Sequence, residues 1–188
     1  MYLLAQFREE RAYPLIMDII HKANIAQIDS LFGDTLTEDL DNILASVYNG
    51  DMTPIYQLIE NENYDEFVRA VGPGILNILV AHDKLSREQV INYYQDLFQN
   101  KLEKDLSYIW EYLVFCSCHL YPEELAEDIK QAFNQNLIDE TGISWMEVQA
   151  YLDRDKDKVL EELKTSREYR LIENTVGELK NWSCFQED

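Results

Sequence analysis

The sequence contains few residues that break helices and few that cross-link chains. Its 188 residues include only 6 glycines and 4 prolines, which disfavours a turn-rich all-β fold. Its 3 cysteines have no disulfide spacing, so we expect reduced thiols and a cytoplasmic location. No apolar run reaches the ~18–20 residues that span a bilayer. The start, "MYLLAQFREERAY", lacks the basic region of a signal peptide.

Basic side chains are also scarce. The chain has 16 Lys and Arg against 36 Asp and Glu, a net charge of −20. Such a charge repels nucleic-acid phosphates and anionic lipid, so we expect neither nucleic acid nor membrane as a partner. From Ala23 to Val68 there is no basic residue, and the acidic residues there are Asp29, Asp34, Glu38, Asp39, Asp41, Asp51, Glu60, Glu62, Asp65 and Glu66. Two interpretations stay open: a solvated face that keeps the protein soluble, or a docking surface for a basic partner.

Apolar residues recur at the spacing of three and four that is typical of one face of an α-helix. One such stripe lies near the C-terminus and consists of Tyr169, Ile172, Val176, Leu179 and Trp182. No stretch alternates cleanly enough to predict a strand. We therefore predict an all-α fold of about ten to twelve helices in one domain, residues 1–188, with a C-terminal capping helix and tail at 167–188. Truncation after Ser166 is predicted to expose the core and cause aggregation.

Helix-start signals separate the stripes. Ser86 with Gln89, and Ser144 with Glu147, have the spacing of a capping box. Pro14, Pro54 and Pro122 fit the first turns of three further helices, where a missing N–H is tolerated.

The predicted helices come in pairs. The stretches "PIYQLIEN", "YYQDLFQN" and "IKQAFNQN" each end a second helix. A two-helix unit that recurs every ~35–45 residues is typical of an α-solenoid, so we predict an α-α superhelix (HEAT-like) of stacked antiparallel pairs. Gly72-Pro73-Gly74 falls within a predicted helix, where proline costs ~3 kcal/mol and predicts a kink or break.

Three stretches carry a family resemblance: "GDTLTEDLDNILASVYNGD", "LSREQVINYYQDLF" and "LYPEELAEDIKQAF". They resemble a bacterial family of uncharacterised proteins, a domain of unknown function with HEAT-like or armadillo-like helical repeats, over roughly Tyr2 to Leu152. The resemblance implies a helical-repeat fold and no assigned activity. Several members end in a cysteine-rich SEC-C zinc motif, which "NWSCFQED" lacks, so zinc binding does not carry over. The first residues look like the inside of a repeat, which leaves open whether an upstream half-repeat is missing.

The stretch "FCSCHLYPEE" concentrates thiols and an imidazole. Cys116 and His119 could share a helix face, but Cys118 lies ~200° away from Cys116, and Cys184 is the only other thiol. We therefore expect no stoichiometric zinc. We expect Phe115 and one cysteine in the core, and His119 as a cationic cap of a helix C-terminus.

Motifs of known chemistry are missing. "DRDKDK" has the alternating carboxylates of a calcium loop, but Lys158 and Lys164 stand where glycine and glutamate are needed. The sequence has no HExxH, GxSxG or P-loop motif, and its histidines at 21, 82 and 119 fall in different helical units. We predict no catalytic, cofactor-binding or metal-binding residues and no cofactor.

Two functions remain open. The first, which we favour, is a non-enzymatic helical-repeat scaffold that binds another protein with a basic surface. Its predicted binding residues are Glu38, Asp39, Asp41, Gln57, Asn92, Gln95, Asp96, Asp128 and Gln131. The alternative is a hydrolytic or metal-dependent enzyme that uses carboxylates in a groove. Carboxylates with a raised pKa in a deep pocket would favour the enzyme, and a shallow face with exposed Gln and Asp would favour binding.

Overall fold

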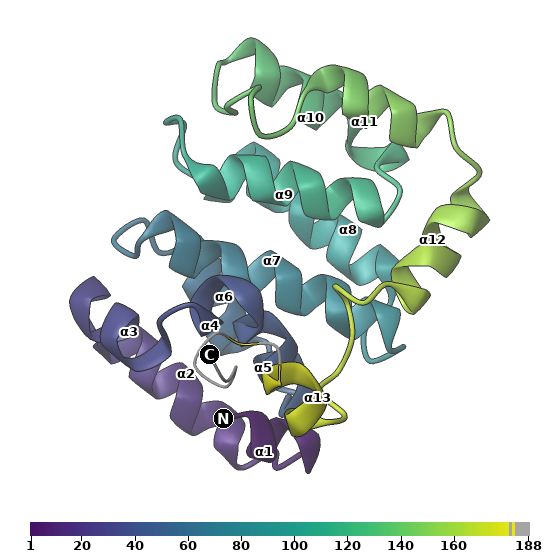
Figure 1. The fold of residues 1–188 in the computed structure, drawn as a ribbon. Helices are drawn as coiled ribbons and strands as arrows, with labels where there is room; N and C mark the ends of the chain where they lie inside the picture. The colour runs from purple at the N-terminus through teal and green to yellow at the C-terminus, as the bar shows by residue number, and fades with distance from the viewer. Residues whose placement is uncertain (181, 183–188) are drawn as a thin grey trace.

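The computed structural model describes residues 1–180 and Trp182, and over these residues it is all α-helical, with thirteen α-helices and no strand (Figure 1). The helices of the first half are α1 (Tyr2–Gln6), α2 (Ala12–Lys22), α3 (Ile25–Phe32), α4 (Thr35–Glu38), α5 (Leu40–Ser46), α6 (Thr53–Glu60) and α7 (Glu66–Ala81). Those of the second half are α8 (Arg87–Asp96), a π-helical turn η1 (Leu97–Lys101), α9 (Tyr108–His119), a 3-10 turn η2 (Glu123–Leu125), α10 (Ala126–Asn134), α11 (Trp145–Leu152), α12 (Lys156–Thr165) and α13 (Thr175–Leu179). None of the described helices is both long and apolar enough to cross a membrane.

Helix starts follow the sequence closely. Both predicted capping boxes form, at Ser86 with Gln89 and at Ser144 with Glu147. Pro14 and Pro54 lie in the first turns of α2 and α6, as predicted. Pro122 stands one residue earlier than expected, as the residue before η2.

The helices stack from α1–α3 at one end to α10 and α11 at the other (Figure 1). α7 packs against α5 on one side and α9 on the other, and α9 contacts α11. A second row contains α6, α8 and α10: Tyr56 of α6 stacks on Tyr93 of α8 at 4.2 Å between ring centroids, and η1 connects α8 with α10. α13 returns to the first end and contacts α1.

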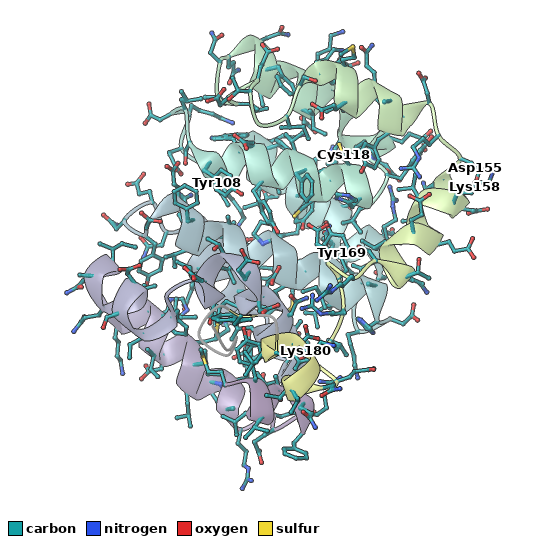
Figure 2. All side chains as sticks on the ribbon, in the orientation of Figure 1. Tyr108, Cys118, Asp155, Lys158, Tyr169 and Lys180 are labelled. Atoms are coloured by element: carbon teal, nitrogen blue, oxygen red, sulfur yellow. The ribbon has the colours of Figure 1, made fainter. Side chains whose placement is uncertain are left out.

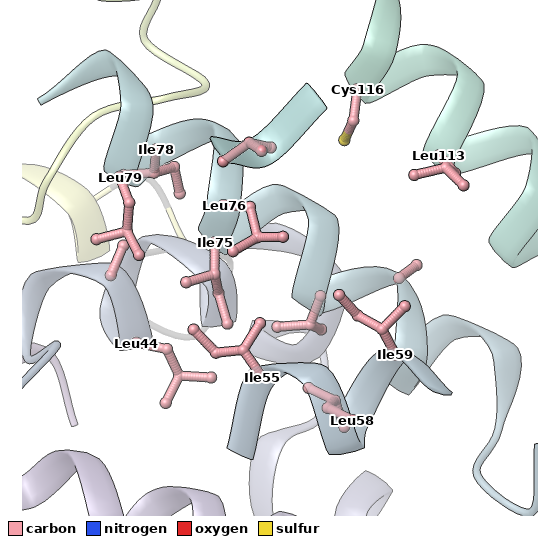
Figure 3. Close-up of a cluster of buried hydrophobic side chains, with 14 of the residues drawn as sticks. Leu44, Ile55, Leu58, Ile59, Ile75, Leu76, Ile78, Leu79, Leu113 and Cys116 are labelled. Carbon is pink, nitrogen blue, oxygen red and sulfur yellow. The ribbon is translucent and has the colours of Figure 1, made fainter. Parts of the chain in front are cut away.

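α7 is the centre of the core. Every residue from Val68 to Ala81 is buried, because this helix is covered by α5, α6 and α9. Figure 3 shows part of this core, with side chains of α5, α6, α7 and α9 meeting. The one charged side chain in the interior of α7, Arg69, is satisfied by the carbonyl of Ile59 at 2.9 Å and by both carboxylate oxygens of Glu103.

Of the kink or break predicted at Pro73, the break is wrong, because α7 continues through the proline, and the kink stays a prediction. The flanking glycines have a packing role instead. A Cβ on Gly72 would lie 2.3 Å from the side chain of Ile59, and a Cβ on Gly74 would lie 2.4 Å from Oδ2 of Asp41. Glycine at these positions therefore lets α5 and α6 approach α7 closely, which offsets the cost of the proline.

The predicted C-terminal helix is much shorter than its apolar stripe. Only α13 is helical, and residues 166–174 between α12 and α13, which we call the strap, are not. Tyr169 and Ile172 of the strap are buried, whereas Val176 of α13 is 75% exposed. Residues 181 and 183–188 of the predicted tail, including Cys184, lie outside the described residues.

Candidate functional site

The strap is fixed by side chains that bind its backbone. Asn42 on α5 donates Nδ2 to the carbonyls of Glu168 and Arg170, at 2.8 and 2.9 Å. The N–H of Ile172 donates to Oγ of Ser46 at 2.8 Å. A non-helical segment has no partners within itself for its buried N–H and C=O groups, so these side chains replace the bonds that a helix would have made.

The strap brings acidic and basic side chains close to the acidic residues at α4 and α5 that were predicted to bind a partner. A cavity of about 410 Å³ is lined by Glu38, Asp39, Arg167, Glu168, Arg170, Glu178 and Trp182. Of the predicted binding residues, Glu38 and Asp39 line this cavity, and Asp41 is close enough to both Asp39 and Glu168 for their charges to affect its pKa.

Asp39 corrects one prediction, because it is a buried structural anchor and not a free docking residue. It is 5% exposed, accepts a hydrogen bond from the hydroxyl of Tyr2 at 2.7 Å, and pairs with Arg170 at 2.8 Å. Arg170 also binds Glu178 at 2.7 Å. No basic residue lies near Asp39 in the sequence, and its partner Arg170 is 131 residues away along the chain.

Asp41 lies at the start of α5 against Gly74 of α7. Its Oδ1 accepts the N–H of Asn42 at 2.7 Å, and no described Lys, Arg or His forms an ion pair with it. Burial, together with the nearby charges of Glu168 and Asp39, raises the pKa of Asp41 to about 7, against the opposing hydrogen bond from the N–H of Asn42. Burial also raises the pKa of Glu168, which has no ion pair among the described residues, although its side chain as a whole is exposed. The two carboxylates are therefore an acidic pair without a counter-ion.

A row of aromatic rings runs along α9 and passes beside this pair. We call it the α9 aromatic stripe; it consists of Phe67, Tyr108, Tyr112, Phe115, His119 and Tyr151. Successive ring centroids lie 4.7, 5.9, 5.7, 4.4 and 5.4 Å apart. Phe67 is 46% exposed, and the other rings are partly buried. The charges of Asp41 and Glu168 reach Tyr112 and raise its pKa after the larger effect of burial, which places the acidic pair next to the stripe.

The sequence contains a signal for this stripe, although none of its residues is among the predicted binding residues. Tyr108, Tyr112, Phe115 and His119 follow one another at helical spacing, but the opposite side of α9 is also apolar, with Ile109, Trp110, Leu113, Val114 and Cys116 fully buried. A helix that is apolar on both sides has more apolar surface than one core contact needs. Figure 2 shows Tyr108 and Cys118 near opposite ends of α9.

His119 is a neutral member of the stripe, which corrects the prediction of a cationic cap. Its Nδ1 lies 3.1 Å from the carbonyl of Phe115, which can only accept, so Nδ1 carries the proton. Its Nε2, 3.0 Å from the hydroxyl of Tyr151, then accepts. Burial lowers the pKa of His119, so the ring is neutral at pH 7. The hydroxyl of Tyr169 lies 3.0 Å from Nδ1 and ties the strap to α9.

The thiols of α9 are part of the core. Cys116 and Cys118 are both buried, one more than predicted, and burial raises the pKa of Cys118 to about 12. Over residues 1–180 and Trp182, no three His, Cys, Asp or Glu side chains are arranged to hold a metal ion. Cys184 is not among these residues.

The remaining predicted binding residues lie on the second row of helices. Gln57, Asn92 and Gln131 are exposed, on α6, α8 and α10. Asp128 receives hydrogen bonds from Gln95 at 3.5 Å and from Gln99 at 3.1 Å, and with Gln131 it lines a cavity of about 260 Å³. Asp96 accepts a bond from Asn100 at 2.9 Å and lies 3.7 Å from Nζ of Lys101. Gln95, Asp128 and Gln131 thus come together, but several of these polar groups bind one another.

Comparison with known proteins gives consistent matches. A family model described as "Protein of unknown function (DUF1186)" matches residues 1–186. Proteins of Chlamydia trachomatis and Chlamydia muridarum, each described as "Uncharacterized protein", are 41% identical over 184 residues. The alignments cover 97% of this chain and 71% and 72% of those two proteins. No solved structure matches the chain.

Proposed function

The chain belongs to the family described as protein of unknown function (DUF1186), and from that premise we propose that it is a non-enzymatic helical-repeat scaffold that binds a basic segment of another protein along α9. The alternation of a row containing α5, α7, α9 and α11 with a row containing α6, α8 and α10 supports a HEAT-like superhelix. Such a fold offers a long continuous face to a partner chain.

The acidic pair beside the aromatic stripe is the observation on which this proposal depends. Several partly buried carboxylates elsewhere pair with a base: Glu103 with Arg69, Glu124 with Arg87, and Glu60 with Lys101. Asp41 and Glu168 have no such partner, and their charges reach Tyr112, whose ring packs on Phe115; both rings are partly buried. Lysine and arginine interact favourably with both carboxylates and aromatic faces.

Glu111 extends the negative charge along the same helix. Burial raises its pKa, and the charges of Asp139 and Glu66 add to the effect. A basic segment that follows α9 would meet Glu111 on α9 as well as the acidic pair beside Tyr112.

Binding of an oligo-arginine peptide, followed by the protein's tyrosine and tryptophan fluorescence, tests the proposal. Affinity is expected to fall several-fold in Glu168→Gln and steeply as salt rises, since both remove electrostatic attraction. Asp153→Asn, an exposed carboxylate after α11, is the matched control and should bind like the wild type. Equal binding by Glu168→Gln and wild type at low salt would refute the proposal.

The same pair favours one alternative, the hydrolytic or metal-dependent enzyme. With a pKa of about 7, Asp41 could serve as a general base at neutral pH. Binding accounts better for Glu168, which is exposed to water, and for the row of rings that continues beyond the pair. The enzyme would be supported if a broad panel of ester, peptide and phosphate substrates showed turnover that Asp41→Asn abolishes.

A further inference from the structure

The exposed apolar side chains of this protein are concentrated at one end. Eight of the twelve large hydrophobic residues that are exposed among the described residues lie within residues 1–31. Leu15 and Ile19 of α2 are 66% and 45% exposed, and Leu31 of α3 is 61% exposed. Ile19 and Leu31 line an open hollow of about 730 Å³ between these two helices. We call the surface formed by Leu15, Ile19, Leu31 and this hollow the α2–α3 face.

The α2–α3 face belongs to a part of the chain that is nearly neutral. Residues 1–31 carry Arg8, Arg11 and Lys22 against Glu9, Glu10, Asp18 and Asp29, a net charge of −1 out of −20. The other 157 residues therefore carry −19. A polyanion repels its own copies through most of its surface, and that repulsion is small at a face that is nearly neutral and apolar.

From this combination of apolar exposure and local neutrality, we propose that the α2–α3 face pairs two copies of this chain. The face is at one end of the helix stack (Figure 1), so joining two copies there keeps the acidic remainders far apart. A two-fold axis makes the contact self-complementary: Leu15 of each copy enters the hollow between α2 and α3 of the other.

The charges on α2 fit such a symmetric contact. Asp18 and Lys22 lie one turn apart and pair at 2.7 Å, and their side chains are 54% and 74% exposed. In an antiparallel pair of α2 helices each Lys22 comes near the partner copy's Asp18, so the same two residues supply attraction in both directions. A partner that carried a basic surface would find little negative charge here, which favours a second copy as the occupant.

Sedimentation equilibrium of the full chain tests this pairing. We expect a concentration-dependent dimer that becomes stronger as salt rises, because salt screens the repulsion between the two acidic bodies while apolar burial remains. This dependence is opposite to that expected for the basic partner, so the two proposals can fail separately. A chain that stays monomeric at high concentration and high salt would overturn the pairing.

Variants locate the interface. Leu15→Glu should weaken the dimer by more than ~tenfold, because both copies would lose a buried leucine and gain a charge. Met146→Glu on α11, where the side chain is 75% exposed, is the matched control and should leave the dimer unchanged. If Leu15→Glu unfolded, as judged by loss of its helical circular dichroism, exchanging the charges of Asp18 and Lys22 would test the interface instead. Asp18→Lys and Lys22→Asp should each weaken the dimer, and the double variant should restore it. A dimer unaffected by these changes, or broken by Met146→Glu, would place the interface elsewhere.

Discussion

At the scale of single residues, the environment of Asp41 is unfavourable for a charged carboxylate. It faces α7 at the position where Gly74 leaves room for it, it has no ion pair among the described residues, and its neighbours Asp39 and Glu168 are also acidic. A residue that destabilises the fold is more easily explained by binding than by packing.

The pH dependence of stability should reveal this cost. The pKa of Asp41 is about 7 in the folded protein and near 3.8 when unfolded, so the folded state binds the proton more tightly. Stability due to this group is therefore present below pH ~4 and falls as pH rises towards 7. Asp41→Asn should raise the free energy of unfolding at pH 8 by ~2–4 kcal/mol and change it little near pH 4.

Urea unfolding of Asp41→Asn and wild type at both pH values measures the difference. Glu38→Gln, an exposed carboxylate on α4, is the control and should show no comparable gain. A variant that is equally or less stable at pH 8 would show that Asp41 is well accommodated in the fold.

At the scale of elements, the strap determines how the segment between α12 and α13 packs on the core. It places Tyr169 and Ile172 in the core without a helix, and its backbone is bound by Asn42, Ser46 and His82. His82 donates Nε2 to the carbonyl of Tyr169 at 3.0 Å, and Arg8 of the N-terminal segment donates to the carbonyl of Ile172 at 2.6 Å. The N-terminal segment is thus joined to the strap.

Two alanine substitutions distinguish the strap from the helix that the apolar stripe predicted. Ile172→Ala should lower the free energy of unfolding by ~2–4 kcal/mol, since Ile172 is fully buried. Val176→Ala should change it by less than ~0.5 kcal/mol, because Val176 is 75% exposed. A continuous helix with one buried stripe would instead require losses of similar size. Chemical denaturation of both variants measures them, and aggregation on truncation after Ser166 stays a prediction of the same kind.

At the scale of the whole molecule, charge is the dominant property. A net charge of −20 on a 22.2 kDa chain makes the compact state repel itself. Local pairs such as Arg170 with Asp39 and Glu178 relieve part of this repulsion. The repulsion between the remaining, solvent-exposed negative charges depends on ionic strength.

We expect the midpoint of thermal unfolding to rise with salt. Screening over ~8 Å at physiological ionic strength favours the folded state, and each ~1 kcal/mol corresponds to ~2–4 °C for a chain of this length. Calorimetry in NaCl and in KCl at equal ionic strength provides the measurement and its control, since screening depends on concentration and not on which of the two cations is present. A midpoint that stays constant or falls would mean that the acidic groups are already compensated.

The sequence by itself determined the helical class, the helix starts and the overall charge. These depend on local physics: capping boxes at Ser86 and Ser144 use side chains three residues from the groups that they bind, and helical periodicity is visible within one element. The burial of both thiols and the aromatic stripe of α9 were also present in the local pattern, but a stripe becomes a candidate binding face only when another side of the same helix fills the core.

The acidic pair, the role of Asp39 and the path of the strap depend on the tertiary structure and could not be found from the sequence. Asp41 and Glu168 are far apart in sequence, and Asn42 and Ser46 bind strap backbone groups up to 128 residues away. The apolar spacing of Tyr169 and Ile172 fits a helix equally well, so the local pattern could not reveal that distant polar side chains would satisfy a non-helical backbone. The same limit applied to Pro73, because the sequence shows the cost of a proline in a helix but not the close packing of α5 and α6 that its flanking glycines allow.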